Sequence, residues 1–251
     1  VPSVAPRALA FVETIAGKPH YLLMVMPPDA IELPTATMPR ETIFIVDTSG
    51  SMHGVSMQQA KNAVSLALKG LKTSDRFNVI EFNSVTRALY TESKPVTVAS
   101  IAEASRFVQQ LQADGGTEMR PALALALDSP PSEEHLRQVV FITDGSVGYE
   151  DELFSIIEDR LGAARLFTVG IGSAPNSWFM RKAAEAGRGS YTFISALHEV
   201  KEKMGGLFKK LEHPQVTDIH VEWPSGVIVD SYPSTVPDLY LGEPVVVKVA
   251  A

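Results

Sequence analysis

The stretch Thr42-Ile-Phe-Ile-Val-Asp47-Thr-Ser49-Gly-Ser51-Met52 decides the fold. Its apolar run does not alternate with polar residues, which predicts a strand buried on both faces, as in a parallel sheet. Asp47, Ser49 and Ser51 follow at every second position, so their short oxygen-bearing side chains can converge on one point. Oxygen ligands without histidine or cysteine suit a hard cation. The stretch therefore predicts a divalent-metal site at the carboxyl end of a buried strand.

The composition of the 251 residues excludes several classes of protein. Hydrophobic residues make up 45% and charged residues 20%, which is typical of a globular protein. The net charge of −7, without any basic block, argues against a nucleic-acid partner. The longest apolar stretch, residues 21–27, has the length of a strand, so no transmembrane segment is expected. The chain has no cysteine, and because it begins with Val1 and lacks a signal peptide we expect it to be a piece of a longer protein.

Strands and amphipathic helices alternate through the middle of the chain. This alternation predicts an α/β fold with a doubly wound, mostly parallel, six-stranded sheet and helices on both of its faces. The turn at residues 83–84 is too short for a crossover, so the third strand should be antiparallel to the second. After the first strand, further strands are expected at 76–82, 88–91, 138–144, 165–171 and 190–194. Helices are expected at 56–71, 100–111, 121–127, 150–161, 176–187 and 197–211, the first capped by Ser56 with Gln59 and the second by Ser100 with Glu103.

Both ends of the chain differ from the middle in their residue pattern. Residues 8–15 and 20–26 predict a hairpin, and prolines between residues 27 and 39 indicate a linker. After Pro214, short strands are expected near 219–223, 227–229, 239–241 and 245–249. Neither end has enough strands to bury itself well. The predicted domains are therefore residues 40–212 and a small antiparallel β module made of residues 1–36 together with 213–251.

Two further segments bring oxygen ligands to the same edge of the sheet. Asp144 ends a second buried strand, and Thr117 lies in a Gly-Gly-Thr loop that precedes a helix. Ligand sites of open α/β sheets lie beyond the carboxyl ends of the strands. Asp47, Ser49, Ser51, Thr117 and Asp144 are therefore the predicted metal ligands, for Mg²⁺ or Mn²⁺ rather than Ca²⁺. If the carboxylates act partly through water, the ion stays electron-poor and has an open position for an outside carboxylate.

These motifs resemble the metal-ion-dependent adhesion site of von Willebrand factor A (VWA) domains, over residues 40–212. The resemblance implies that Ser49, Ser51 and Thr117 bind the ion directly or switchably, and that Asp47 and Asp144 often bind it through water. Residues 21–28 and 75–83 are similar to inter-alpha-trypsin inhibitor heavy chains, in which a vault-type (VIT) domain precedes the VWA domain. Residues 167–177 are similar to their bacterial relatives, the marine proteobacterial sortase target proteins. This likeness implies a place at the cell surface, in the periplasm or outside the cell.

The predicted function is adhesion without catalysis: the ion would hold an acidic group of a protein or matrix-like ligand. Two alternatives stay open at this point. The first is an intracellular VWA adaptor of an ATPase or chelatase machine, which the β module disfavours. The second is a phosphotransferase in which Asp47 takes a phosphoryl group. Such enzymes usually have a second carboxylate two residues on, where this chain has Ser49, and no histidine lies at a useful spacing from Asp47 or Asp144.

Overall fold

The chain of the computed structural model divides into two compact units. One is Met38–Phe208, and the other joins Val1–Thr37 to Lys209–Ala251. The predicted domain limits, residues 40–212 and residues 1–36 with 213–251, stay predictions. The structure describes residues 5–28, 39–128, 134–145, 148–173, 175–212, 214–217, 219–224, 226–233, 235–240 and 242–250.

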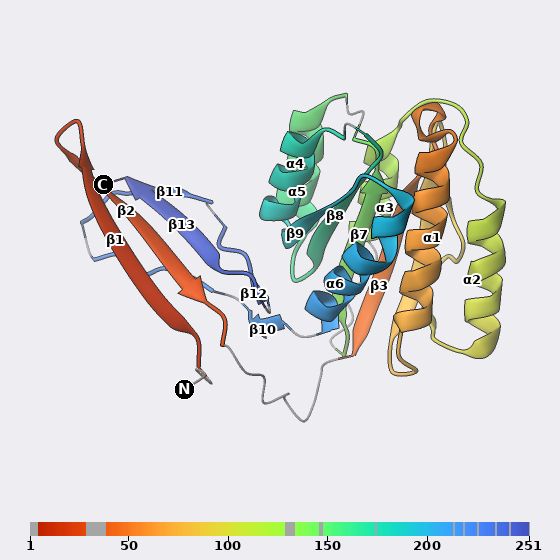
Figure 1. Ribbon diagram of the computed structural model, residues 1–251, viewed down its shortest axis with the longest axis horizontal. Helices are drawn as coiled ribbons and strands as arrows, with labels where there is room; N and C mark the ends of the chain where they lie inside the picture. The colour runs from red at the N-terminus through yellow and green to blue at the C-terminus, as the bar shows by residue number, and fades with distance from the viewer. Residues whose placement is uncertain are drawn as a thin grey trace. The chain divides into compact units, whose positions relative to one another are not determined.

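A mostly parallel sheet forms the centre of the larger unit (Figure 1). Its strand order is β5-β4-β3-β7-β8-β9, and β5 alone on this path runs antiparallel to its neighbour. The order changes direction at β3, from which the chain goes first to β4 and later to β7. This path confirms the predicted doubly wound sheet. The strands are β3 (Arg40–Asp47), β4 (Arg76–Phe82), β5 (Thr86–Ala88), β7 (Leu136–Thr143), β8 (Arg165–Ile171) and β9 (Arg188–Ile194).

Helices cover both faces of this sheet (Figure 1). Ile43 and Ile45 of β3 join one core cluster with residues of α3, α4 and α5. Phe44 points to the opposite face, where its ring centroid lies 6.4 Å from that of Phe208 in α6. Alternate residues of β3 are thus buried against different helices, which explains its unbroken apolar run. The helices are η1 (Gly50–Met52), α1 (Val55–Gly70), α2 (Val98–Gln110), α3 (Met119–Asp128), α4 (Glu150–Arg160), α5 (Ser177–Ala186), η2 (Leu197–Glu199) and α6 (Val200–Glu212).

The ends of several elements differ from the predictions. The predicted Ser56–Gln59 capping box is wrong, because α1 begins after Gly54, whose φ of 75° favours glycine. Helix α2 begins at Val98, two residues before Ser100, and its capping box joins Thr97 to Ser100, not Ser100 to Glu103. The strand expected at 88–91 is Thr86–Ala88 instead, and a seventh strand, β6 (Lys94–Pro95), adds to the six predicted. Asn176 caps α5 as predicted, its side-chain oxygen accepting from Phe179 N at 3.1 Å.

The smaller unit contains an antiparallel sheet of order β1-β2-β13-β11. Strands β1 (Arg7–Ile15) and β2 (Lys18–Met26) form the predicted hairpin, and positive φ angles at Ala16 and Gly17 fit a two-residue type I′ turn. Strand β13 (Val245–Ala250) pairs with β2, so the two chain ends share one sheet. One face of this sheet packs on a cluster centred on Leu239, Val245, Val247 and Val249.

Two of the strands predicted for the smaller unit were predicted wrongly. The strand expected at 227–229 lies instead at β11 (Asp230–Tyr232), and the described residues of 219–223 form no strand. Ile219 and Trp223 nevertheless pack against the core cluster, so their alternation reflects burial without sheet pairing. A short pair, β10 (Pro214–Val216) with β12 (Leu239–Tyr240), completes the unit.

Candidate metal centre

The centre is built on the carboxyl end of β3, where Asp47 is the last residue of the strand. The Asp47 side chain is completely buried, and so is nearly all of Ser49. Ser51 is exposed and lies in the 3-10 turn η1. The Oγ atoms of Ser49 and Ser51 lie 3.1 Å apart. The strand–loop–helix order therefore brings three of the five predicted ligands together.

Both oxygens of the Asp47 carboxylate accept hydrogen bonds from neighbouring residues. Ser49 N donates to Oδ1 at 2.8 Å, and Thr143 Oγ1 donates to Oδ2 at 2.5 Å. Thr143 ends β7, the strand next to β3 in the sheet. Thr143 Oγ1 in turn accepts from Gly145 N at 3.0 Å. These bonds fix the carboxylate between the carboxyl ends of two neighbouring strands.

The carboxylate of Asp47 lies in an unfavourable electrostatic environment. Burial raises the pKa of this carboxyl above its ordinary value, and the negative charge of Asp144 raises it further. Hydrogen bonds from Ser49 and Thr143 lower the pKa, but the net shift is upward and burial is its largest cause. Within the described part of the chain, Asp47 forms no ion pair with a basic side chain. A cation bound nearby would offset this cost, because opposite charge favours the ionised carboxylate.

The loop that carries Thr117 lies against the Asp47 loop. Gly50 N donates to Gly115 O at 3.1 Å, and Asp114 N donates to Thr48 O at 2.8 Å. Thr117 and Asp144 are both half-buried. Asp144 is close enough to Asp47 for its charge to act on that carboxyl. All five predicted ligands are thus on segments that meet at the carboxyl edge of the sheet.

The donor set fits a small divalent cation. Neighbouring ligands of an octahedral ion at about 2.1 Å lie roughly 3 Å from one another, close to the 3.1 Å between the Ser49 and Ser51 hydroxyl oxygens. The described residues contain no group of three or more His, Cys, Asp or Glu side chains that could hold a metal. A metal here would therefore depend on hydroxyl oxygens as well as on the two carboxylates.

Comparison with known families gives the identity of the larger unit. A model of the von Willebrand factor type A domain matches residues 40–193. The chain belongs to the VWA family. Among its curated relatives, a VWA domain-containing protein of Dictyostelium discoideum is 29% identical over 208 residues, which are 82% of this chain and 25% of that protein. Inter-alpha-trypsin inhibitor heavy chain H3 of Bos taurus is 27% identical over 223 residues, 84% of this chain and 25% of the relative. The chain thus spans about a quarter of the length of these relatives.

Solved structures share the fold of this VWA protein. A von Willebrand factor type A protein from Catenulispora acidiphila superposes with a TM-score of 0.73 at 22% identity, covering 99% of this chain and 65% of the other. The pilus adhesin SpaC from Lactobacillus rhamnosus GG gives a TM-score of 0.58 at 13% identity, covering 98% of this chain and 43% of the adhesin. VWA domains generally mediate protein–protein interactions, and VWA-containing relatives are generally non-catalytic.

The structure adds two supports of the VWA centre that the sequence reasoning did not name. Thr143 holds Asp47, as described above. Ser84 holds the Thr117 loop: its Oγ accepts from Gly116 N at 2.7 Å, and the neighbouring Asn83 O accepts from Glu118 N at 2.8 Å. These two bonds hold Gly116 and Glu118, the residues on either side of Thr117. The only sequence signal was the Asn-Ser turn itself, which predicts a bend but not what the bend contacts.

Replacing Ser84 with alanine is expected to weaken metal binding roughly tenfold, as is typical when a support of a metal ligand is lost. The fold should keep its melting temperature, because Gly116 is exposed and its N–H can bond to water. Calorimetric titration of EDTA-stripped protein with MnCl₂ would measure the affinity. Ser155→Ala removes a comparable exposed hydroxyl from α4 and serves as the matched control. Equal affinities for both variants would show that Ser84 does not position Thr117.

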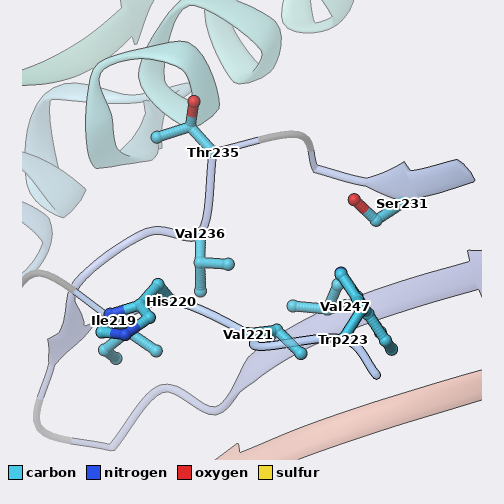
Figure 2. A pocket seen from close by; sticks show the side chains of 8 residues that line it. All are labelled: Ile219, His220, Val221, Trp223, Ser231, Thr235, Val236 and Val247. Carbon is cyan, nitrogen blue, oxygen red and sulfur yellow. The ribbon is translucent and has the colours of Figure 1, made fainter. Parts of the chain in front are cut away.

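A separate hollow of about 300 Å³ lies in the smaller unit (Figure 2). Its apolar lining comes from Ile219, Val221, Trp223, Val236 and Val247. His220 is the one titratable residue among the described lining, and its Nε2 lies 3.5 Å from Glu222 Oε1. Ser231 and Thr235 contribute hydroxyls to the hollow, but no carboxylate is among its described lining. It therefore lacks the combined hydroxyl and carboxylate set of the metal centre.

Proposed function

We propose that this VWA protein binds a partner through a divalent cation, Mg²⁺ or Mn²⁺, held by Asp47, Ser49, Ser51, Thr117 and Asp144. The observation that carries the proposal is the state of Asp47: a completely buried carboxylate whose pKa is raised, next to a second carboxylate and without a described cationic partner. A site that keeps such a charge at a cost to stability is typical of a functional site.

The hydrogen bonds of Asp47 suggest how each ligand takes part. Both of its oxygens already accept from Ser49 and Thr143, which favours contact with the ion through water or through charge alone. The hydroxyls of Ser49, Ser51 and Thr117 would then be the inner ligands. Neutral hydroxyl oxygens leave the ion electron-poor, so it would bind an anionic oxygen of a partner strongly. A carboxylate on a protein or matrix-like ligand has this chemistry.

Asp47 is a poor candidate for covalent catalysis. A phosphoryl acceptor must reach its substrate, whereas the Asp47 side chain is completely buried and both of its oxygens are engaged. We therefore propose a binding function without catalysis. Surface or extracellular placement is proposed from the likeness to inter-alpha-trypsin inhibitor heavy chains and from the shared fold of a pilus adhesin. None of the described helices is both long enough and apolar enough to cross a membrane.

Two measurements test the proposal. Titration of EDTA-stripped protein with MnCl₂ or MgCl₂ should show one site per chain, and its absence would contradict the metal centre. An array of peptides carrying Asp or Glu, each paired with its Asn or Gln counterpart, should then bind the protein only when the acid is present and only with Mg²⁺. Binding that survives excess EDTA would overturn the adhesion mechanism while leaving the metal site intact.

A further inference from the structure

The outer edge of the smaller unit's sheet is formed by a strand with no described cover. β1 is the end strand of the order β1-β2-β13-β11, and all nine of its residues are exposed. Four of them are large and apolar, and their exposed fractions are high: Leu9 48%, Phe11 54%, Val12 66% and Ile15 51%. A long apolar edge strand is a template for pairing with another strand, and natural proteins rarely leave one open.

Both faces of β1 take part in this apolar edge. The register with β2 places Ala10 opposite Leu23 and Phe11 opposite Leu22. Because Leu23 packs on the core cluster, Ala8, Ala10 and Val12 share the core-facing side. Leu9 and Phe11 therefore lie on the other side, in line with the partly exposed Leu22 and Met24 of β2. A strand added beside β1 would cover apolar side chains on both faces at once.

We propose that β1 pairs with β1 of a second copy of this chain, antiparallel and centred on Ala10. The sequence of β1 is complementary to itself in this register. Arg7 would lie opposite Glu13, Leu9 opposite Phe11 and Ala8 opposite Val12, and each pair would occur twice about a two-fold axis. Cross-strand pairs of opposite charge and of apolar residues both stabilise a sheet. Two four-stranded sheets would thereby become one of eight strands.

The neighbouring registers fit less well. Centring the pair on Phe11 would set Leu9 against Glu13 and Arg7 against Ile15, which loses both charge pairs. A centre one residue further on, at Val12, would set Phe11 against Glu13. The register centred on Ala10 pairs apolar residues with apolar residues on each face, and it places opposite charges against each other at the two ends. The interface is small, so we expect a weak dimer, in the micromolar-to-millimolar range, that does not depend on metal.

The test is sedimentation velocity of the whole chain from 10 µM to 1 mM, in EDTA and again in MgCl₂. The chain should dimerise equally in both buffers. Arg7→Glu and Glu13→Arg should each weaken the dimer roughly tenfold, because each sets like charges opposite one another at both ends of the pair. A 1:1 mixture of the two variants should restore association as a heterodimer, since position 7 of each chain then faces a position 13 of opposite charge in the other.

Matched controls change charge equally at exposed positions of the other unit: Arg106→Glu on α2 and Glu92→Arg after β5 should leave the dimer unchanged. A chain that stays monomeric at 1 mM overturns the proposal and leaves the β1 edge to some other strand. So does a dimer that the Arg7 and Glu13 variants do not affect. A dimer that forms only with Mg²⁺ also overturns it and would assign the association to the metal centre.

Discussion

Replacing Asp47 with asparagine is expected to abolish divalent-cation binding while leaving the metal-free VWA domain at least as stable as before. The amide keeps the volume of the carboxylate and keeps an oxygen to accept from Ser49 N. Its Nδ2 can donate to Thr143 Oγ1, since a hydroxyl has two acceptor positions. What is lost is the charge. Near a divalent ion, one charge is worth several kcal/mol even at an effective dielectric of about 20, so affinity should fall at least about a hundredfold.

The direction of the stability change follows from the pKa of Asp47. Burial raises this pKa in the folded, metal-free state, so the folded protein prefers the protonated carboxyl. A group of this kind stabilises the fold most below its unfolded pKa and loses that stabilisation as pH rises through the folded value. At neutral pH the ionised Asp47 is therefore a cost to the metal-free protein, and asparagine removes it. When metal is bound, the ionised Asp47 stabilises the folded protein instead, because the cation favours the ionised form.

Thermal unfolding in EDTA and in saturating MgCl₂, with calorimetric MnCl₂ titration, would check both halves of this expectation. The unaltered protein should gain melting temperature from Mg²⁺, and Asp47→Asn should not. Thr117→Ala offers a comparison, because Thr117 is half-buried and its loss should reduce affinity with little effect on the metal-free fold. A large drop in melting temperature of Asp47→Asn in EDTA would mean that the Asp47 charge stabilises the fold, contrary to this account.

The sequence predicted the architecture well because its signals were local and repeated. The unbroken apolar run of β3 indicates a strand with helices on both sides, and both sides are covered by helices. Helix starts were harder to predict. Ser56 has the chemistry of a cap, but Gly54 ends the preceding turn with a positive φ, and that conformation, rather than the cap residue, sets where α1 begins. The conformation of the preceding loop therefore outweighs the capping propensity of a single residue in setting where the helix begins.

The candidate site was predictable in its ligands but not in their supports. Asp47, Ser49 and Ser51 are close in sequence, and their spacing is visible at once. That Asp47 is buried and bonded to Thr143 depends on the register between β3 and β7, which are 96 residues apart at this contact. The spacing in the sequence does not show that the Asp47 side chain is completely buried. The β4–β5 turn that holds the Thr117 loop is likewise a long-range contact without a local signal.

The charged side chains at the amino-terminal end of β3 form buried ion pairs, in contrast to Asp47 at the carboxyl end. Arg40 Nη2 lies 2.5 Å from Asp75 Oδ2, and both side chains are buried. Glu41 Oε2 and Arg137 Nε form a second buried pair at 2.8 Å. Asp75 also accepts from the backbone N atoms of Arg40 and Lys72. Charges at this end are thus paired within the protein, whereas Asp47 at the other end has no described cationic partner.

Removing Asp75 is therefore expected to damage the fold and spare the metal centre. Asp75→Ala would break the buried ion pair with Arg40 and remove the acceptor of two backbone N–H groups. Breaking a buried pair by removing one partner typically costs about 3–5 kcal/mol of unfolding free energy. Metal affinity should not change, because residues 40 and 47 are roughly 23 Å apart along an extended strand. Urea unfolding in EDTA, monitored by the circular dichroism signal of the helices, would measure the stability. Titration with MnCl₂ would measure the metal affinity.

A double-mutant cycle makes this last expectation specific to the ion pair. Arg40→Met alone should also destabilise, because it leaves the Asp75 carboxylate buried without its cation. The double variant Arg40→Met/Asp75→Ala removes both charges, so it should be more stable than Asp75→Ala despite carrying one more substitution. Additive losses would show that the two side chains act independently and that packing, not pairing of charge, stabilises this end of β3. A loss below about 1 kcal/mol for Asp75→Ala, the range of exposed pairs, would likewise contradict the assignment.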